Sequence, residues 1–201
     1  MWINEQTERT VSMTKAATKR QSAAQTAQAS LSRRFFAYLI DWYVGGLATA
    51  LPVAFFSMRQ YQTVQNQNIM QFTAPYGVVA GVLALICAVL YYAVIPACVW
   101  KGQTPGKRML HLKIVHTDGT DVTAGTIFLR QLVGIIVLEG GLVTASTIWH
   151  QVATLLTGVE LVKPLMYVGM VVSVISALLV AARNHTAIHD RLAGTQVVQQ
   201  A

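Results

Sequence analysis

Four long apolar stretches constrain what this chain can fold into. They cover about residues 35–58, 76–100, 124–157 and 161–182, and the second contains no charged residue. An α-helix needs roughly 20 apolar residues to cross a bilayer, and each stretch is long enough. A soluble domain of this size has too much surface for its volume to hide so many apolar side chains. The pattern therefore predicts an all-α membrane protein.

Composition agrees with a membrane protein and argues against a nucleic-acid partner. Only 11% of the 201 residues are charged, against about 25% in typical soluble domains. A net charge of +7 would suit nucleic-acid binding. The basic residues stand beside the apolar stretches, however, which indicates membrane topology instead. We expect the lipid bilayer, and no nucleic acid, as the surrounding partner.

The expected architecture is a four-helix transmembrane bundle with crossings at about residues 35–58, 76–100, 126–150 and 161–182. The third crossing is the least regular, because it contains Arg130 and Glu139, and Gly140-Gly141 follows the acid. One crossing bent at the glycine pair and two shorter broken helices both fit this segment. Residues 1–30 are polar and lack the apolar centre of a signal peptide. They are expected to form a flexible cytoplasmic tail before one transmembrane domain over residues 31–198.

A short β-hairpin is expected between the second and third crossings. Leu110, Leu112 and Ile114 alternate with other residues, which is the period of a strand with one apolar face. Asp118-Gly119 follows, and this dipeptide is typical of two-residue hairpin turns. The return strand would begin at Asp121, and the hairpin would lie against the inner face of the membrane.

The distribution of lysine and arginine predicts the orientation. With four crossings, 13 of the 15 basic residues fall before residue 35, between residues 101 and 130, or after residue 182. Basic residues concentrate on the cytoplasmic side of membrane proteins. Both termini and the loop that begins at residue 101 should therefore be cytoplasmic. Five crossings would place the C-terminal basic residues outside and are disfavoured.

Charged residues inside the apolar stretches are the candidate functional residues. An acid near the centre of a membrane helix costs roughly 2.5–3.5 kcal/mol on insertion scales, so Asp41 should face protein or water. We expect Arg34 to pair with Asp190 near the inner surface, and Asp41 to pair with Arg130 more deeply. A functional role and a purely structural clamp are equally open for this cluster. Glu139 is expected to line a pathway, or else to lie solvated near the outer surface.

The loop Gly102-Gln-Thr104-Pro105-Gly106-Lys107 superficially resembles a phosphate-binding loop. It has three residues between its glycines where that motif needs four, and Arg108 stands where the motif has Ser or Thr. A turn shaped by the proline and glycines is favoured. In this interpretation Lys101, Lys107 and Arg108 meet anionic lipid headgroups.

The remaining candidates for chemistry are weak. His185 and His189 have the spacing of a metal pair on a helix, but no third ligand is evident, so a cap or interface role is favoured. Cys87 and Cys98 would lie about 16 Å apart along one helix, beyond disulfide reach. No nucleophile has a recognisable base partner. We expect no metal, no cofactor and no enzymatic activity.

Several of these segments together resemble the RDD family of bacterial membrane proteins, which is named for one arginine and two aspartates. Residues 34–41 resemble its opening. Residues 102–107, 112–115 and 118–119 resemble the loop after its second helix, residues 128–130 the start of its third helix, and residues 189–198 its closing motif. On this resemblance, which covers residues 31–198, Arg34, Asp41 and Asp190 are the name-giving residues. The resemblance implies a bacterial cytoplasmic membrane protein, for which transport is the usual suggestion.

Transport of a small solute or a cation, with proton coupling as an option, is the favoured function. Asp41 would be the titratable or cation-coordinating group, with Arg34, Arg130 and Asp190 as partners. A carboxylate in a partly dry site has a raised pKa and can exchange a proton for a cation. Four helices enclose a narrow pathway, so a homo-oligomer is expected. The alternative is a non-catalytic membrane scaffold or accessory subunit, whose buried charges only hold the helices together.

Overall fold

The computed structural model describes residues 28–140, 144–182 and 186–200. The predicted tail over residues 1–30 lies almost entirely outside these ranges, as do Gly141 and His185. In chain order the elements are helix α2 (Leu31–Tyr61), the 3₁₀ turn η1 (Ile69–Gln71), helix α3 (Tyr76–Val89) continued by the π-helix η2 (Leu90–Val99), helix α4 (Pro105–Met109), strand β1 (Leu112–His116), helix α5 (Ala124–Phe128) continued by the π-helix η3 (Leu129–Leu138), helix α6 (Thr144–Thr157), helix α7 (Val162–Ala181), helix α8 (Ile188–Leu192) and strand β2 (Thr195–Gln199).

Three helices are long and apolar enough to cross a membrane. They are Leu31–Tyr61, Tyr76–Val99 and Val162–Ala181, and they correspond to the first, second and fourth predicted crossings. Large apolar side chains point away from the bundle on α2 and α7, including Leu51 and Leu178, which are 68% and 65% exposed. Such an outer surface suits lipid and would be unfavourable in water. The helices therefore fit a membrane protein.

The third predicted crossing is two shorter helices rather than one. The helix α5–η3 ends at Leu138, where the N–H of Glu139 donates to Gly134 O, and α6 begins at Thr144. Of the two forms expected for this segment, the structure contains the two shorter helices. The interruption coincides with an acid followed by glycine, neither of which favours the interior of an apolar helix.

The strand predicted from the alternation that begins at Leu110 is present as β1 (Leu112–His116), but its predicted hairpin partner is wrong. Strand β1 pairs antiparallel with the C-terminal strand β2, in the register that places Ile114 opposite Val197. The turn at Asp118-Gly119 leads only to a single bridge between Val115 and Asp121. The return is short because Thr123 already caps α5, accepting a hydrogen bond from Thr126 N.

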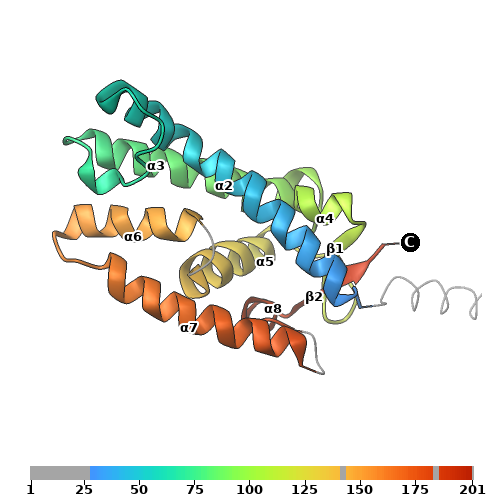
Figure 1. Cartoon of the computed structure of the whole chain (residues 1–201). Coiled ribbons are helices and arrows are strands. Elements are labelled where there is room, and N and C mark those ends of the chain that lie inside the picture. Colours follow the sequence, from blue (N-terminus) through green and yellow to red (C-terminus); the bar gives the residue numbers. More distant parts are fainter. Residues whose placement is uncertain (1–27, 141–143, 183–185, 201) are drawn as a thin grey trace, which may run out of the picture.

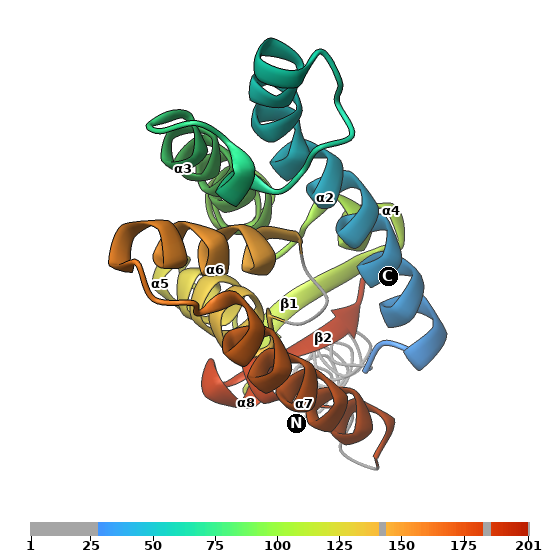
Figure 2. The ribbon, with the colours of Figure 1, turned by 60° about the vertical axis from the view of Figure 1, so that its left-hand side comes forward.

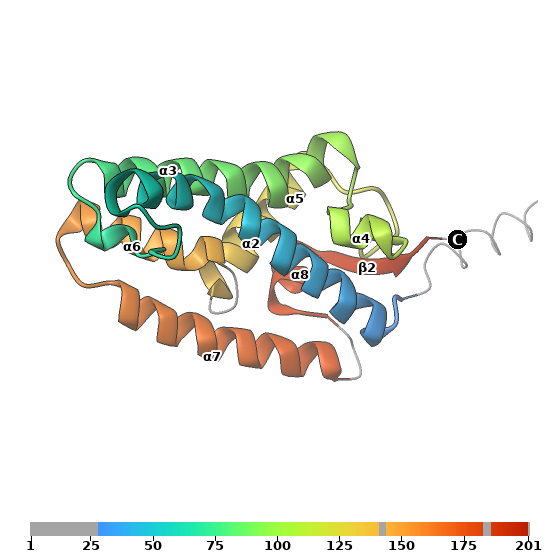
Figure 3. The same ribbon diagram turned by 45° about the horizontal axis from the view of Figure 1, so that its top comes forward.

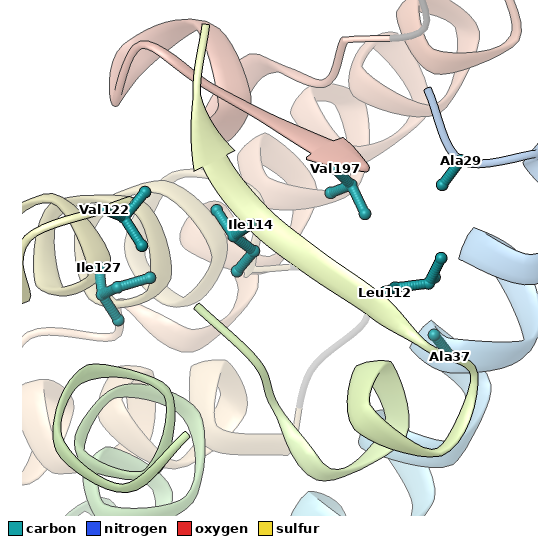
Figure 4. Close-up of a cluster of buried hydrophobic side chains, with 7 residues drawn as sticks. All are labelled: Ala29, Ala37, Leu112, Ile114, Val122, Ile127 and Val197. Atoms are coloured by element: carbon teal, nitrogen blue, oxygen red, sulfur yellow. The ribbon is translucent and has the colours of Figure 1, made fainter. Parts of the chain in front are cut away.

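The small sheet has its own apolar core. Figure 4 shows these side chains between β1, β2, α5 and the start of α2, namely Ala29, Ala37, Leu112, Ile114, Val122, Ile127 and Val197. All are almost fully buried. Because β2 supplies Val197 to this core while residues 117–121 supply none, burial selects the C-terminal strand as the partner of β1.

The elements that surround the charged residues gather at one end of the bundle. The sheet, α4, α8 and the N-terminal end of α2 lie at this end, and η1 and the connection from α6 to α7 lie at the other (Figures 1 and 3). Helix α3 packs against both α2 and α6, and the view in Figure 2 shows α7 on the side of the bundle away from α3. We call the first end the sheet end.

Candidate functional site

Asp190 is the centre of a buried ion-pair cluster at the sheet end. Its Oδ2 lies 2.9 Å from Arg34 Nη2, and its Oδ1 lies 2.5 Å from Arg130 Nη2. Arg130 Nε donates to the same Oδ1 and to Thr195 Oγ1, and Ala187 N donates to Oδ2. The predicted pair of Arg34 and Asp190 is thus present, with Arg130 as a second partner. The cluster joins α2, η3 and α8.

The charges around Asp190 hold it ionised. Burial alone would raise the pKa of this carboxyl, but the positive charges of Arg130 and Arg34 hold its pKa below the ordinary value. A carboxylate with two guanidinium partners and a backbone donor has little capacity to bind a further ligand. Its geometry is that of a clamp between helices.

Asp41 is the centre of a second cluster, built around helix α4. Its Oδ1 accepts hydrogen bonds from Gly106 N at 2.8 Å and from Tyr91 Oη at 3.1 Å. Its Oδ2 accepts from Thr104 Oγ1 and lies 3.5 Å from Lys107 Nζ. The carboxylate is almost fully buried and has four donors.

The predicted pairing of Asp41 with Arg130 is therefore wrong. Nε and Nη2 of Arg130 are directed to Asp190, while Lys107 supplies the cation for Asp41. The backbone N–H of Gly106, in the first turn of α4, has no acceptor within its own helix and donates to Asp41 instead, and such donors at a helix start favour an anion. The buried charges thus form two clusters rather than one.

The loop motif at residues 102–107 provides the surroundings of Asp41. Thr104 caps α4 by accepting from Lys107 N, and Pro105 occupies the first turn, where a missing N–H costs nothing. Gly106 is required for space, because a Cβ there would overlap Ala37 O and lie 2.9 Å from the Asp41 carboxyl carbon. Gly102 has φ of +78° and packs against β1, a conformation that favours glycine. The structure therefore agrees with the predicted turn, and the anion that accepts hydrogen bonds from this loop is the Asp41 carboxylate.

The three basic residues expected to meet lipid headgroups lie in different surroundings. The Lys107 side chain is only 15% exposed and points to Asp41. Burial lowers the pKa of Lys107, and the charge of Asp41 opposes this shift. Lys101 and Arg108 are exposed, and the guanidinium of Arg108 lies 4.7 Å from the centre of the Trp100 ring. Lys101 and Arg108 are thus accessible at the surface, whereas the Lys107 side chain is directed into the protein.

Glu139 lies where the third apolar segment is interrupted, and it is bound by α7 and α8. Its Oε1 accepts hydrogen bonds from Ser176 Oγ at 2.7 Å and from His189 N at 3.0 Å. His189 Nδ1 lies 2.9 Å from both carboxylate oxygens. The backbone carbonyl of Glu139 accepts from Ser173 Oγ. The side chain is 11% exposed, so this acid lies inside the bundle.

His189 connects Glu139 with the Asp190 cluster. Its Nε2 lies 3.7 Å from Asp190 Oδ1, while its Nδ1 faces Glu139. Burial and the charge of Arg130 lower the pKa of His189, so the neutral imidazole is favoured. Sequence reasoning assigned His189 only a cap or interface role. The signal that could have revealed this contact is that Glu139, an acid within an apolar segment, requires a hydrogen-bond donor.

Two further residues of the clusters, Tyr91 and Thr195, were missed by sequence reasoning, and Thr104 was a candidate only as part of the loop motif. Tyr91, Thr104 and Thr195 contribute side-chain hydroxyls to Asp41 or to Arg130. Across the described ranges, no group of three or more side chains could hold a metal ion. Among the described residues, Oε2 of Glu139 has a single hydrogen-bond partner, Nδ1 of His189.

Comparison with known proteins agrees with this pattern. The model of the RDD family matches residues 28–194, a range that includes Arg34, Asp41, Arg130, Glu139 and Asp190. Neither the curated proteins nor the solved structures contain a match.

Proposed function

This chain belongs to the RDD family, and from this premise we propose that it transports a small solute or a cation across the bacterial cytoplasmic membrane along a pathway past Glu139. The supporting observation is the position of Glu139 at the interruption between η3 and α6. Interrupted helices are a recurrent way to build ion and solute sites inside the membrane. An acid kept at such a place is costly and indicates function by default.

The three acids differ in what they can still bind. Asp41 has donors from three side chains and one backbone N–H, and Asp190 has two arginines and a backbone N–H. Glu139 has no lysine or arginine partner among the described residues, and it pairs with a histidine that burial keeps neutral. We therefore transfer the titratable or ligand-binding role proposed for Asp41 to Glu139, with Arg34, Asp41, Arg130 and Asp190 as clamps.

We further propose four crossings with both termini cytoplasmic. In this arrangement α5–η3 and α6 together form the third crossing. Of the described basic residues, Arg59 and Lys163 lie toward the far end, near η1 and the α6–α7 connection. The others lie at or near the sheet end, as the rule for cytoplasmic loops would require. A homo-oligomer would enlarge the narrow pathway of a single bundle.

Flux measurements on reconstituted protein test the proposal. Wild-type protein in liposomes should conduct a cation or small solute in an assay that follows internal pH and ion content. Glu139→Gln should reduce this flux to the level of empty liposomes, because the carboxylate is lost while its shape remains. Glu160→Gln, in the exposed α6–α7 connection, is the matched control and should conduct like wild type. Wild-type flux in the Glu139→Gln variant, or none in wild type, would overturn the proposal.

A membrane scaffold is the second candidate. It is favoured by the saturation of Asp41 and Asp190, because charges with complete sets of partners stabilise a bundle without serving a ligand. This candidate predicts no flux for any common ion, together with a stable stoichiometric complex with another membrane protein.

A further inference from the structure

One terminal nitrogen of the Arg130 guanidinium is buried and has no hydrogen-bond partner among the described residues. The side chain is only 2% exposed, and its Nε and Nη2 donate to Asp190 and Thr195. Its Nη1, which carries two N–H groups, meets no acceptor within the described ranges. Burying a donor of a charged group without an acceptor is unfavourable. An acceptor supplied by a bound ligand would remove this cost.

The helix that contains Arg130 has two further features of a binding site. Nε2 of Gln131, the next residue, is also buried without a partner in the part of the chain that the structure describes. Two consecutive residues of η3 thus have unused N–H donors inside the bundle. The segment is a π-helix, a form that is rare and often found at functional sites. Donors without acceptors select a ligand that accepts hydrogen bonds.

The positive charge of Arg130 is only partly neutralised. Over the described ranges, Asp190 is the one acid at ion-pair distance from Arg130, and Asp190 Oδ2 also lies 2.9 Å from Arg34 Nη2. The field of Arg130 extends beyond this cluster, since burial and the charge of Arg130 both lower the pKa of Lys107 and of His189. A buried cation that shares its counter-charge favours an additional anion.

We propose that Arg130 Nη1 is the recognition group of a binding site for a small monovalent oxyanion, such as formate, acetate or nitrate. The oxygens of these planar anions match the N–H groups of a guanidinium, which is why arginine is frequent at carboxylate sites. One negative charge would complete the neutralisation of Arg130, while Nε and Nη2 keep their contacts to Asp190. The site goes beyond the proposed function, because it does not include Glu139 and does not require transport.

Other ligand classes fit this position less well. A metal cation would be repelled by the guanidinium, and the described residues contain no group of three or more side chains that could hold one. A doubly charged anion would be repelled more strongly by the Asp190 carboxylate. A lipid headgroup would have to reach a side chain that is almost fully buried. Water can accept from Nη1 but leaves the charge of Arg130 unchanged, so the experiment must distinguish it from an anion.

Equilibrium dialysis of radiolabelled formate against the purified full-length protein in detergent tests the site. Wild type should bind formate saturably, nitrate should compete, and chloride at equal concentration should not. Arg130→Lys keeps a cation for Asp190 but has no second terminal nitrogen, so it should bind formate at least tenfold more weakly. Arg191→Gln, which removes an exposed arginine of α8, is the matched control and should bind like wild type.

A second substitution decides the question if Arg130→Lys does not fold. Arg34→Gln removes the other guanidinium from Asp190, so that Asp190 neutralises Arg130 more fully. It should therefore bind formate more weakly than wild type. Arg34→Lys restores the positive charge and should bind formate more tightly than Arg34→Gln. Equal formate binding by wild type and Arg34→Gln would then overturn the inference.

The outcomes separate this inference from the proposed function. Wild type without saturable formate binding would overturn the inference, because Nη1 would then be hydrated only. Equal binding by wild type and a folded Arg130→Lys variant would also overturn it, as would equal competition by chloride, since the site would not recognise an oxyanion. Formate binding that depends on Arg130, together with no flux in liposomes, would support this site and reject transport.

Discussion

At the scale of single residues, the two arginine partners of Asp190 decide how substitutions there should behave. Asp190→Asn leaves the buried Arg130 and the partly buried Arg34 without their counter-charge. Removing one partner of a buried pair typically costs about 3–5 kcal/mol. Arg34→Gln should cost less, because Arg130 still neutralises Asp190. Unfolding followed in detergent should therefore rank wild type above Arg34→Gln, and Arg34→Gln above Asp190→Asn.

The same geometry predicts the result of a charge swap. Arg34→Asp combined with Asp190→Arg would restore a simple pair. However, the Asp190→Arg change also places a new arginine next to Arg130, which is almost fully buried, so two positive charges would meet there. The double variant should therefore be no more stable than the less stable of the two single variants, Arg34→Asp and Asp190→Arg. Recovery of wild-type stability would contradict the assignment of Arg130 as the second partner of Asp190.

His189 predicts a pH dependence of stability with a definite sign. Burial and Arg130 lower its pKa in the folded protein, with Asp190 and Glu139 opposing the shift. The unfolded protein, with a histidine pKa of about 6.5, therefore binds protons first. The contribution of His189 is fully present above that value and is lost as the pH falls toward the folded pKa. The thermal midpoint of wild type should decrease between about pH 7.5 and pH 5.5.

The matched variants for this effect are both histidine substitutions. His189→Gln removes the titrating ring and should flatten the decrease over this pH range. His116→Gln removes a histidine from the partly exposed end of β1 and should retain the wild-type slope. An unchanged slope in His189→Gln would show that the destabilisation at low pH has another source.

At the scale of elements, the contact between α4 and α2 depends on a missing side chain. Gly106→Ala would push a methyl group into Ala37 O and the Asp41 carboxyl group. Overpacking of this kind costs typically about 1–3 kcal/mol, and loss of the Gly106 N–H bond to Asp41 would add to it. Gly106→Ala should therefore lower the midpoint of unfolding in detergent.

A second glycine offers the control for this substitution. Gly125 lies in the first turn of α5, and a Cβ there would meet nothing closer than Thr123 Oγ1 at 3.9 Å. Gly125→Ala should be neutral or stabilising by up to about 1 kcal/mol, because alanine favours helices. If both variants behave alike, the close packing of α4 on Asp41 does not limit stability.

At the scale of the whole molecule, the number of membrane crossings can be determined by measuring from which side of the membrane each loop can be labelled. In a Cys87→Ala, Cys98→Ala background, single cysteines at Lys113 and Gln199 should be labelled from one side of the membrane. Cysteines at Gln65 and Glu160 should be labelled from the other side, because these residues lie at the far end of the bundle. Labelling of residue 160 from the side of residue 113 would show that α5, η3 and α6 do not cross together.

Much of the fold could be predicted from local pattern. The first, second and fourth apolar stretches are helices of spanning length, and most of the alternating segment that begins at Leu110 lies in β1. The interruption of the third stretch was already indicated by Glu139 and the glycine that follows it. These features can be predicted because they depend only on the length of an apolar stretch and on residues close together in the chain, which set the length of a spanning helix and the period of a strand.

The partners of the charged and paired segments were decided by the tertiary structure alone. Asp41 meets Lys107 rather than Arg130, and β1 pairs with β2 rather than with its own return strand. These contacts join residues far apart in the chain, and any acid in the sequence could in principle pair with any base. Packing selects among these possible partners. The apolar core of the sheet buries Val197, which pairs β2 with β1, and the first turn of α4 places its hydrogen-bond donors at Asp41. The sequence by itself determined that charges would lie inside a helical membrane bundle, and packing decided which of them meet.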